Sequence, residues 1–451
     1  NQRRLGDAML PAQALDLITN SLIPLTTAPG VNGAIVYLDS VIDYAALDAN
    51  WCSPDANNDV VRQVGALIDQ IRDARPGLRH LVIVGGDDIV PMARVDDITR
   101  TGNEAEYANE LLAGNGGQTT PLTEALGTRH FLTDDPYGDL DPIAWFNRRL
   151  YVPDLAVGRL VESHDEIAAT VAAYLDPNGD GTTTDAGVMP ASSTYMTGYD
   201  FMADGATKTR AALDAALTLA GGAVPASTKN ISPPDAMVTK TQVLTGAAGG
   251  RAVGLFGHFA HDGALTDAGF RSNSGESFTP TELAAALRPA STPANARLVF
   301  SIGCHSGLNV TDGPAGSTDF AQQVLGTGAV YVAMTTYGYG AQGVVGLNEA
   351  LMAEFASQLD GSYVLINPTG GTALANRRYL SIGEAFVAAK QEYFSSQGLY
   401  GAYDEKSLEA ATFFGLPMYR VGQSGPQRTA AAPEVPTAAG GSAAYSVVDQ
   451  S

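Results

Sequence analysis

Two short apolar segments decide the fold of this chain: Arg251–Gly257 (RAVGLFG), followed by His258, and Arg297–Gly303 (RLVFSIG), followed by Cys304. Short apolar runs between turn residues are typical of buried parallel strands, and open α/β sheets carry reactive groups just beyond the carboxyl ends of such strands. If the two strands are neighbours, an imidazole and a thiol meet at one edge of the sheet. A nearby histidine can hold a cysteine as thiolate, the form that attacks a carbonyl. The sequence therefore predicts a cysteine nucleophile.

Strand and helix signals alternate along much of the chain. Strand-like segments occur at 33–43, 80–91 and 194–200, an amphipathic helix is predicted at 59–74, and a closing strand is predicted at 412–422. Such alternation favours an α/β fold with a mostly parallel sheet and helices on both faces.

The chain is predicted to contain two consecutive α/β units. The boundary between them is the segment DPNGDGTTTD, which has no hydrophobic periodicity. The expected divisions are a helical lead-in at 1–30, an N-terminal α/β unit at 31–187, a catalytic α/β unit at 188–422, and an Ala/Gly/Ser/Pro-rich tail or linker at 423–451.

The amino-acid composition indicates which kinds of molecule the protein is not expected to bind. Lys and Arg number 26 against 48 Asp and Glu, a net charge of −22, which repels nucleic acid and anionic lipid. No run approaches the roughly 18 apolar residues of a membrane helix, so membrane insertion is not expected. The two cysteines, Cys52 and Cys304, form no disulfide framework. The chain begins at Asn1, and we expect a secreted or cell-surface protein cut from a longer polypeptide with further domains.

Several motifs occur in a specific order along the chain. FGHFAHDG contains His258, and FSIGCHSG contains Cys304. VIVGGDDIVP, TDDPYGDL and DLAVGRL precede them, whereas GTGAVYVAMTTYG, LSIGEAFVAAKQEYF and FFGLPMYRVG follow. In this order the chain resembles the gingipain family of cysteine peptidases, in the caspase-like clan, over residues 31–422.

The resemblance implies a caspase-like fold and a catalytic dyad of His258 and Cys304. It also implies an oxyanion hole made by the backbone N–H groups of Phe259 and Cys304. The family has glycine where this chain has Phe259, but any residue except proline supplies an N–H. His261 is the alternative catalytic histidine if the register is shifted by three residues.

One acidic residue is predicted to bind substrate. Asp134 falls where Arg-cleaving members of the family carry the carboxylate at the base of the S1 pocket, so the resemblance implies a preference for a basic P1 residue. A buried carboxylate suits a guanidinium, because the two groups form paired, charge-assisted hydrogen bonds. The alternative is that Asp134 is a solvated loop acid.

A partial calcium loop is also predicted. Asp176, Asn178 and Asp180 supply oxygens at positions one, three and five, and Gly181 follows at position six. Position twelve is Gly187 rather than glutamate, so the segment is not an EF-hand. We expect that the reaction needs no cofactor and that any calcium is structural.

The function that the sequence favours is a cysteine endopeptidase that acts on protein or peptide substrates through an acyl-enzyme. A transpeptidase or sortase with the same dyad is the nearest alternative, because an amine resolves an acyl-enzyme as readily as water does. Two further alternatives are an inactive peptide-binding scaffold and a zinc-binding scaffold. The zinc ligands would be His258, His261, Cys304 and His305.

Overall fold

The computed structural model describes residues 9–114, 117, 119–259, 269–288, 295–310, 318–360 and 380–422. An eight-stranded sheet forms its centre, in the order β1-β6-β16-β15-β14-β10-β8-β9. The strands are β1 (His80–Val84), β6 (Ala156–Leu160), β16 (Ala411–Phe414), β15 (Val330–Met334), β14 (Leu298–Ser301), β10 (Ala252–Leu255), β8 (Ser193–Tyr199) and β9 (Ala226–Ser232).

Every neighbouring pair in this sheet is parallel except β15 and β16, so the strand direction reverses between those two. The expected mostly parallel α/β sheet is therefore confirmed. Strands from both expected units join it, because β1 and β6 precede residue 188 and the other six follow.

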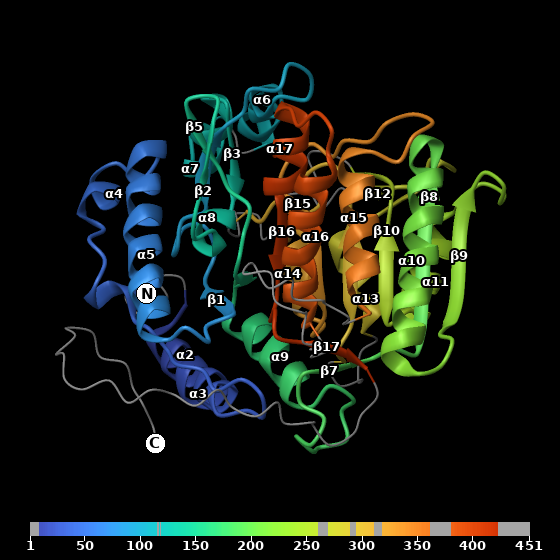
Figure 1. Cartoon of the computed structure of the whole chain (residues 1–451), viewed down its shortest axis with the longest axis horizontal. Helices are drawn as coiled ribbons and strands as arrows, with labels where there is room; N and C mark the ends of the chain where they lie inside the picture. Colours follow the sequence, from blue (N-terminus) through green and yellow to red (C-terminus); the bar gives the residue numbers. More distant parts are fainter. Residues whose placement is uncertain are drawn as a thin grey trace, which may run out of the picture.

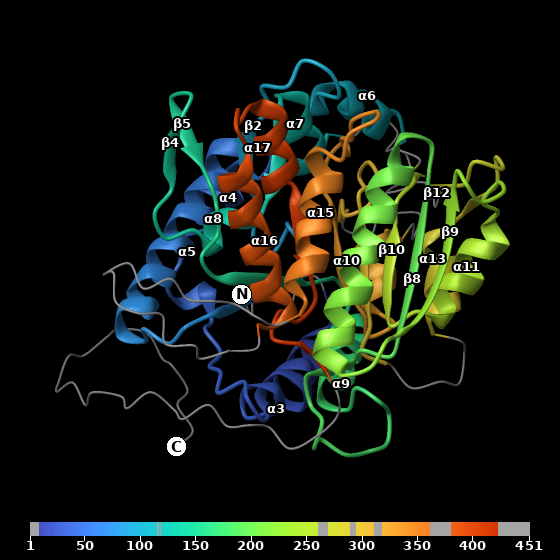
Figure 2. The ribbon, with the colours of Figure 1, turned by 45° about the vertical axis from the view of Figure 1, so that its right-hand side comes forward.

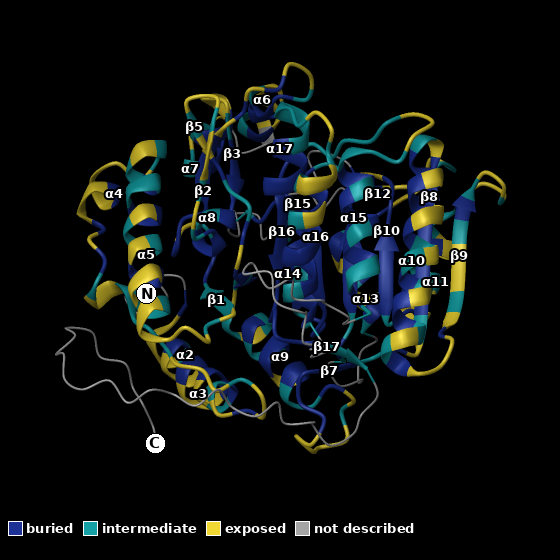
Figure 3. Ribbon diagram, in the orientation of Figure 1, coloured by how far each residue is buried: buried dark blue, intermediate teal, exposed yellow. Residues whose placement is uncertain are grey.

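Helices cover both faces of the sheet (Figures 1 and 2). One layer contains α10 (Ala203–Gly221), α15 (Leu347–Gln358), α16 (Ile382–Ser396) and α17 (Ala402–Glu409). The other contains α9 (His164–Leu175), α11 (Lys240–Gly249), α13 (Pro280–Leu287) and α14 (Phe320–Leu325). Exposed residues occur on α9, α10, α11, α13 and α16, whereas every residue of α14, α15 and α17 is buried or intermediate (Figure 3). Every residue of β10, β14 and β15 is buried, as their continuous apolar sequences require.

The remaining helices and four small sheets lie outside the central sheet and its two helix layers. The helices are α2 (Pro11–Asp16), η1 (Leu17–Leu22), α3 (Ile23–Thr26), η2 (Leu38–Ser40), α4 (Ala45–Ala49), α5 (Pro54–Ala74), α6 (Glu104–Gly114), α7 (Pro121–Gly127), α8 (Asp135–Gly138) and η3 (Asp200–Met202). The small sheets are β2 (Ala93–Asp96) with β3 (His130–Thr133), β4 (Ile143–Trp145) with β5 (Arg148–Leu150), β7 (Val188–Pro190) with β17 (Arg420–Gly422), and β11 (His258–Phe259) with β12 (Phe270–Arg271) and β13 (Ser277–Phe278).

Two sequence predictions of structure are wrong. The closing strand expected at 412–422 is two short strands, because β16 ends at Phe414 in the central sheet and β17 pairs with β7. Residues 33–43 form no strand, and their regular part is the short helix η2. The physical reason lies in the polar residues that interrupt the apolar run, because the Ser40 hydroxyl donates to the Tyr37 carbonyl (2.8 Å) and closes a turn. No helix among the described residues has the length and apolarity needed to cross a membrane. Secretion or surface display stays a prediction.

Candidate active site

Three neighbouring strands deliver three polar side chains to one edge of the sheet. Parallel β8, β10 and β14 are in register, with Thr197 opposite Leu255 and Leu255 opposite Ser301. Three residues after these paired positions, the three segments contain the polar residues Asp200, His258 and Cys304. Because the carboxyl ends of parallel strands meet at one edge, the register brings these residues together.

Asp200 is the carboxylate next to His258. His258 Nε2 lies 3.6 Å from Asp200 Oδ2, and both side chains are about half exposed. Asp200 has a left-handed backbone (φ 55°), which starts the turn of η3 immediately after β8. Phe201, the next residue, packs edge-on to the His258 ring with centroids 5.8 Å apart.

Tyr199, the last residue of β8, holds the backbone at His258. The His258 N–H donates to the Tyr199 hydroxyl (2.9 Å), and that hydroxyl donates to the Arg271 carbonyl. Arg271 is the partner of His258 in the β11–β12 pair. The tyrosine hydroxyl therefore joins the two opposed residues, and burial raises the pKa of Tyr199 to about 12, so it stays a neutral donor.

Phe259 contacts the nucleophile segment directly. Its side chain is 4% exposed, and a Cβ placed on Gly303 would overlap its ring. Gly303 therefore gives the Phe259 ring the space that any other residue would fill. The contact joins the residue after His258 to the residue before Cys304.

Cys304 lies in a mostly buried position at the end of β14. Its sulfur lies 3.9 Å from the Gly338 carbonyl oxygen, the acceptor for its S–H. Burial raises the pKa of the Cys304 thiol above its ordinary value, and the Gly338 hydrogen bond acts in the opposite direction. This direction favours the Cys304 thiol over the thiolate, which differs from the expectation that a neighbouring imidazole holds the sulfur ionised.

An open cleft of about 530 Å³ is lined by Asp200, Phe201, Gly340 and Gln342. Glu349 lies behind its wall: a Cβ on Gly340 would be 3.1 Å from Glu349 Oε2. The side chain of Glu349 is fully buried, and burial raises its pKa to about 7. The cleft therefore has one carboxylate in its lining and a second one behind it.

Asp134 does not face an open site. Arg159 is fully buried and donates to both Asp134 oxygens, from Nε to Oδ2 (2.8 Å) and from Nη2 to Oδ1 (2.5 Å). The Arg159 guanidinium also donates to the carbonyls of Gly85 and Val90. Asp134 thus binds a guanidinium, but this guanidinium belongs to Arg159 rather than to a substrate. These contacts give no support to an S1 role, which stays a prediction.

The other predicted site residues have different environments. His261 lies outside the described residues. His305 is buried, and its Nε2 bonds to Glu104 Oε2 (2.8 Å). In the 176–181 loop, both Asp176 oxygens accept backbone N–H groups, from Asp180 and from Gly181. The calcium hypothesis stays a prediction.

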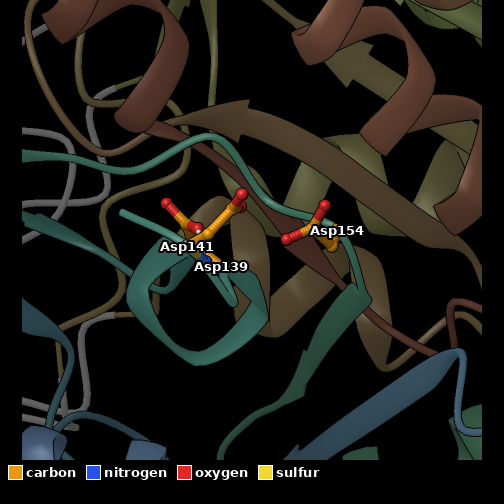
Figure 4. Close-up of side chains that lie close together, drawn as sticks. All are labelled: Asp139, Asp141 and Asp154. Carbon is orange, nitrogen blue, oxygen red and sulfur yellow. Dashed lines mark hydrogen bonds between the residues drawn. The ribbon is translucent and has the colours of Figure 1, made fainter. Parts of the chain in front are cut away.

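One cluster among the described residues has three side chains close enough to share a metal ion: Asp139, Asp141 and Asp154, with oxygens within 4.8 Å of one another (Figure 4). Both oxygens of Asp139 already accept backbone N–H groups, from Asp141 and Val152. The cluster includes neither Cys304 nor His258, so the described residues give no support to a zinc centre at the dyad.

Tyr199 and Asp200, which lie next to His258, were not predicted from the sequence as candidate site residues. A signal was present, because the strand-like segment 194–200 ends in Asp200 just as the other two strands lead to His258 and Cys304. The role of Glu349 had no such signal, since it lies on a helix behind the cleft.

Comparison with known protein families identifies the family of this chain. The model of "Peptidase family C25" matches residues 20–422. Among solved structures, the Arg-specific cysteine proteinase gingipain R aligns with a TM-score of 0.49 and 14% identity, over 80% of this chain and 68% of the other. A complex of the pro- and mature domains of RgpB from Porphyromonas gingivalis aligns with a TM-score of 0.47 and 15% identity, over 79% and 69%. No curated protein matches the chain.

Proposed function

The chain belongs to peptidase family C25 and is a cysteine peptidase, and we propose that Cys304 and His258 form its catalytic dyad, with Asp200 as the carboxylate that orients the imidazole. As a peptidase it acts on protein or peptide substrates. The observation that carries the proposal is the common register of β8, β10 and β14, which brings these three residues to one sheet edge, where Asp200 lines an open cleft.

In the proposed reaction, the Cys304 sulfur attacks the scissile carbonyl carbon while the thiol proton passes to His258. The imidazolium then gives that proton to the leaving amine, and water hydrolyses the thioester. Asp200 stabilises the imidazolium through the 3.6 Å ion pair. The backbone N–H groups of Phe259 and Cys304 hold the oxyanion. Because burial raises the thiol pKa, proton transfer accompanies attack rather than preceding it.

The enzyme is also proposed to prefer a basic P1 residue. Asp200 lines the cleft, so a cationic side chain would find a carboxylate there. Glu349, behind the wall at Gly340, adds negative charge only above about pH 7, because burial raises its pKa. Asp134 is a weaker candidate for this role, because Arg159 already occupies both of its oxygens. Transpeptidation by the same dyad remains the alternative, in which an amine replaces water.

The test compares Cys304→Ala with Cys52→Ala on a peptide library, with and without an added amine acceptor. We expect Cys304→Ala to abolish turnover and Cys52→Ala to retain it, with cleavage after Arg or Lys. Turnover by folded Cys304→Ala would contradict the dyad. Products joined to the amine, rather than hydrolysed, would favour transpeptidation.

A further inference from the structure

A chain of buried charged side chains ends at His305, the residue after Cys304. Asp97, Lys406, Glu104 and His305 form it, and each is at most 6% exposed. Lys406 Nζ lies 2.7 Å from Asp97 Oδ2 and 2.7 Å from Glu104 Oε1. Glu104 Oε2 lies 2.8 Å from His305 Nε2. Charges buried this completely are costly unless they are paired, and here each has a partner of opposite sign or a hydrogen bond.

Glu104, the first residue of α6, contacts both segments that flank the nucleophile. Its Oε2 binds the imidazole of His305, the residue after Cys304. Its Oε1 accepts the backbone N–H of Tyr337 (3.2 Å), the residue before Gly338. Because the Gly338 carbonyl is the acceptor for the Cys304 thiol, one carboxylate fixes the neighbours of both the sulfur and its acceptor.

The backbone at His305 needs this support. It is left-handed (φ 54°), a conformation that non-glycine residues keep only when their surroundings impose it. The imidazole is stacked on Tyr107, with centroids 3.8 Å apart, and Tyr337 packs edge-on to it at 4.8 Å. The His305 N–H donates to the Thr336 carbonyl (2.6 Å). The turn that directs Cys304 is thus held from three sides.

We propose that Glu104 is a positioning residue for the Cys304 nucleophile, which acts through His305 and Tyr337 and is itself held by Lys406. This inference rests on the proposed role of Cys304. Glu104 touches no part of the cleft lining, so its effect on the reaction is transmitted through the two flanking segments.

The same groups set the charge around the thiol. These are Glu104 from α6, Lys406 from α17 with its partner Asp97, and Tyr337 after β15. His258 and Asp200 follow the neighbouring strands β10 and β8 of the same sheet edge. Burial is the main cause that raises the Cys304 pKa, Glu104 raises it further, and Lys406 lowers it. Removal of the negative charge of Glu104 should therefore lower the pKa of the Cys304 thiol. It should also leave Cys304 less firmly positioned.

The experiment measures iodoacetamide labelling of Cys304 against pH, together with kcat and KM, in a Cys52→Ser background. For Glu104→Gln, we expect the midpoint of the labelling curve to move to lower pH. We also expect kcat to fall about 10- to 100-fold with KM within about threefold, because loss of orientation affects the reacting geometry more than binding. His305→Asn keeps a residue that tolerates the left-handed backbone and keeps the Glu104 charge. It should lower kcat similarly without moving the labelling midpoint to lower pH.

Asp135→Asn is the matched control, because Asp135 is a buried carboxylate that pairs with a buried lysine, Lys390, at 2.6 Å. It should leave the labelling curve unchanged. The proposal is overturned if Glu104→Gln reproduces the wild-type curve and kcat, or if Asp135→Asn changes them equally. If Glu104→Gln does not fold, wild-type kcat in His305→Asn overturns it. Labelling requires no substrate, so this outcome is distinct from failure of the dyad, which would appear as turnover by Cys304→Ala.

Discussion

The substitution Asp134→Asn separates a structural role of this carboxylate from a role in substrate binding. In the structure, the side chain of Arg159 is fully buried and Asp134 is its only carboxylate partner within salt-bridge distance among the described residues. Asparagine keeps the shape but removes the charge, and its amide group faces the guanidinium with one acceptor instead of two. Removal of one partner from a buried ion pair leaves an uncompensated charge, so we expect a loss of about 3 to 5 kcal/mol in the free energy of unfolding.

Urea unfolding measures this loss, and kcat/KM for matched peptides with Arg or Ala at P1 measures the functional effect. If Asp134 is structural, folded enzyme should lose activity equally on both peptides. Asp59→Asn is the control, because it disrupts an exposed pair with Arg62 and should cost at most about 1 kcal/mol. Wild-type stability, combined with a loss of about 2 to 5 kcal/mol confined to the Arg peptide, would refute our reasoning and restore Asp134 to the S1 pocket.

Three further predictions concern the dyad, the cleft and the calcium loop. Asp200→Asn should lower kcat about 10-fold or more while the fold is retained, because the imidazolium loses its carboxylate; an unchanged kcat would exclude Asp200 from the mechanism. Burial raises the pKa of Glu349 to about 7, so its contribution to stability, about 3 kcal/mol, should be complete below about pH 4.5 and lost as the pH rises through 7. Glu349→Gln should flatten the dependence of the unfolding midpoint on pH, and an equal slope in both proteins would contradict this. If the 176–181 loop binds calcium, added Ca²⁺ should raise the unfolding temperature of wild type but not of Asp176→Asn/Asp180→Asn, whereas no shift in wild type would exclude the site.

The sequence predicted the sheet because the sheet depends on local, strongly patterned segments, and the dyad hypothesis comes from two of these segments. The apolar runs before His258 and Cys304 are too hydrophobic to be anything but buried, and glycines mark where each strand gives way to a turn. The segment at 33–43 has a similar apolar beginning, but polar residues interrupt it and it finds no partner strand. Whether such a segment becomes a strand depends on pairing with a neighbouring strand, and the sequence of the segment alone does not determine that pairing.

The roles of the acidic residues were harder to predict for a related reason. The chain contains 48 Asp and Glu residues, so an individual carboxylate carries little information. Asp134 and Arg159 are 25 positions apart, and only the fold shows that they form a pair. Asp200 could have been predicted from the sequence, because the argument that joined the ends of two strands applies equally to a third strand. Glu104, which lies far from Cys304 in sequence, could not.

Phe259 is the feature that most favoured an inactive scaffold, and its surroundings now weaken that alternative. The family has glycine at this position, so a large side chain would be expected to displace the nucleophile segment. Instead, the ring lies over Gly303 and packs against Phe270 and Phe320, with centroids 5.5 and 5.0 Å away. The side chain is directed into the core, and phenylalanine, unlike proline, has the backbone N–H that the proposed oxyanion hole requires. The ring of Phe259 therefore fits in the space that a Cβ at position 303 would occupy, and its size gives no reason to expect an inactive site.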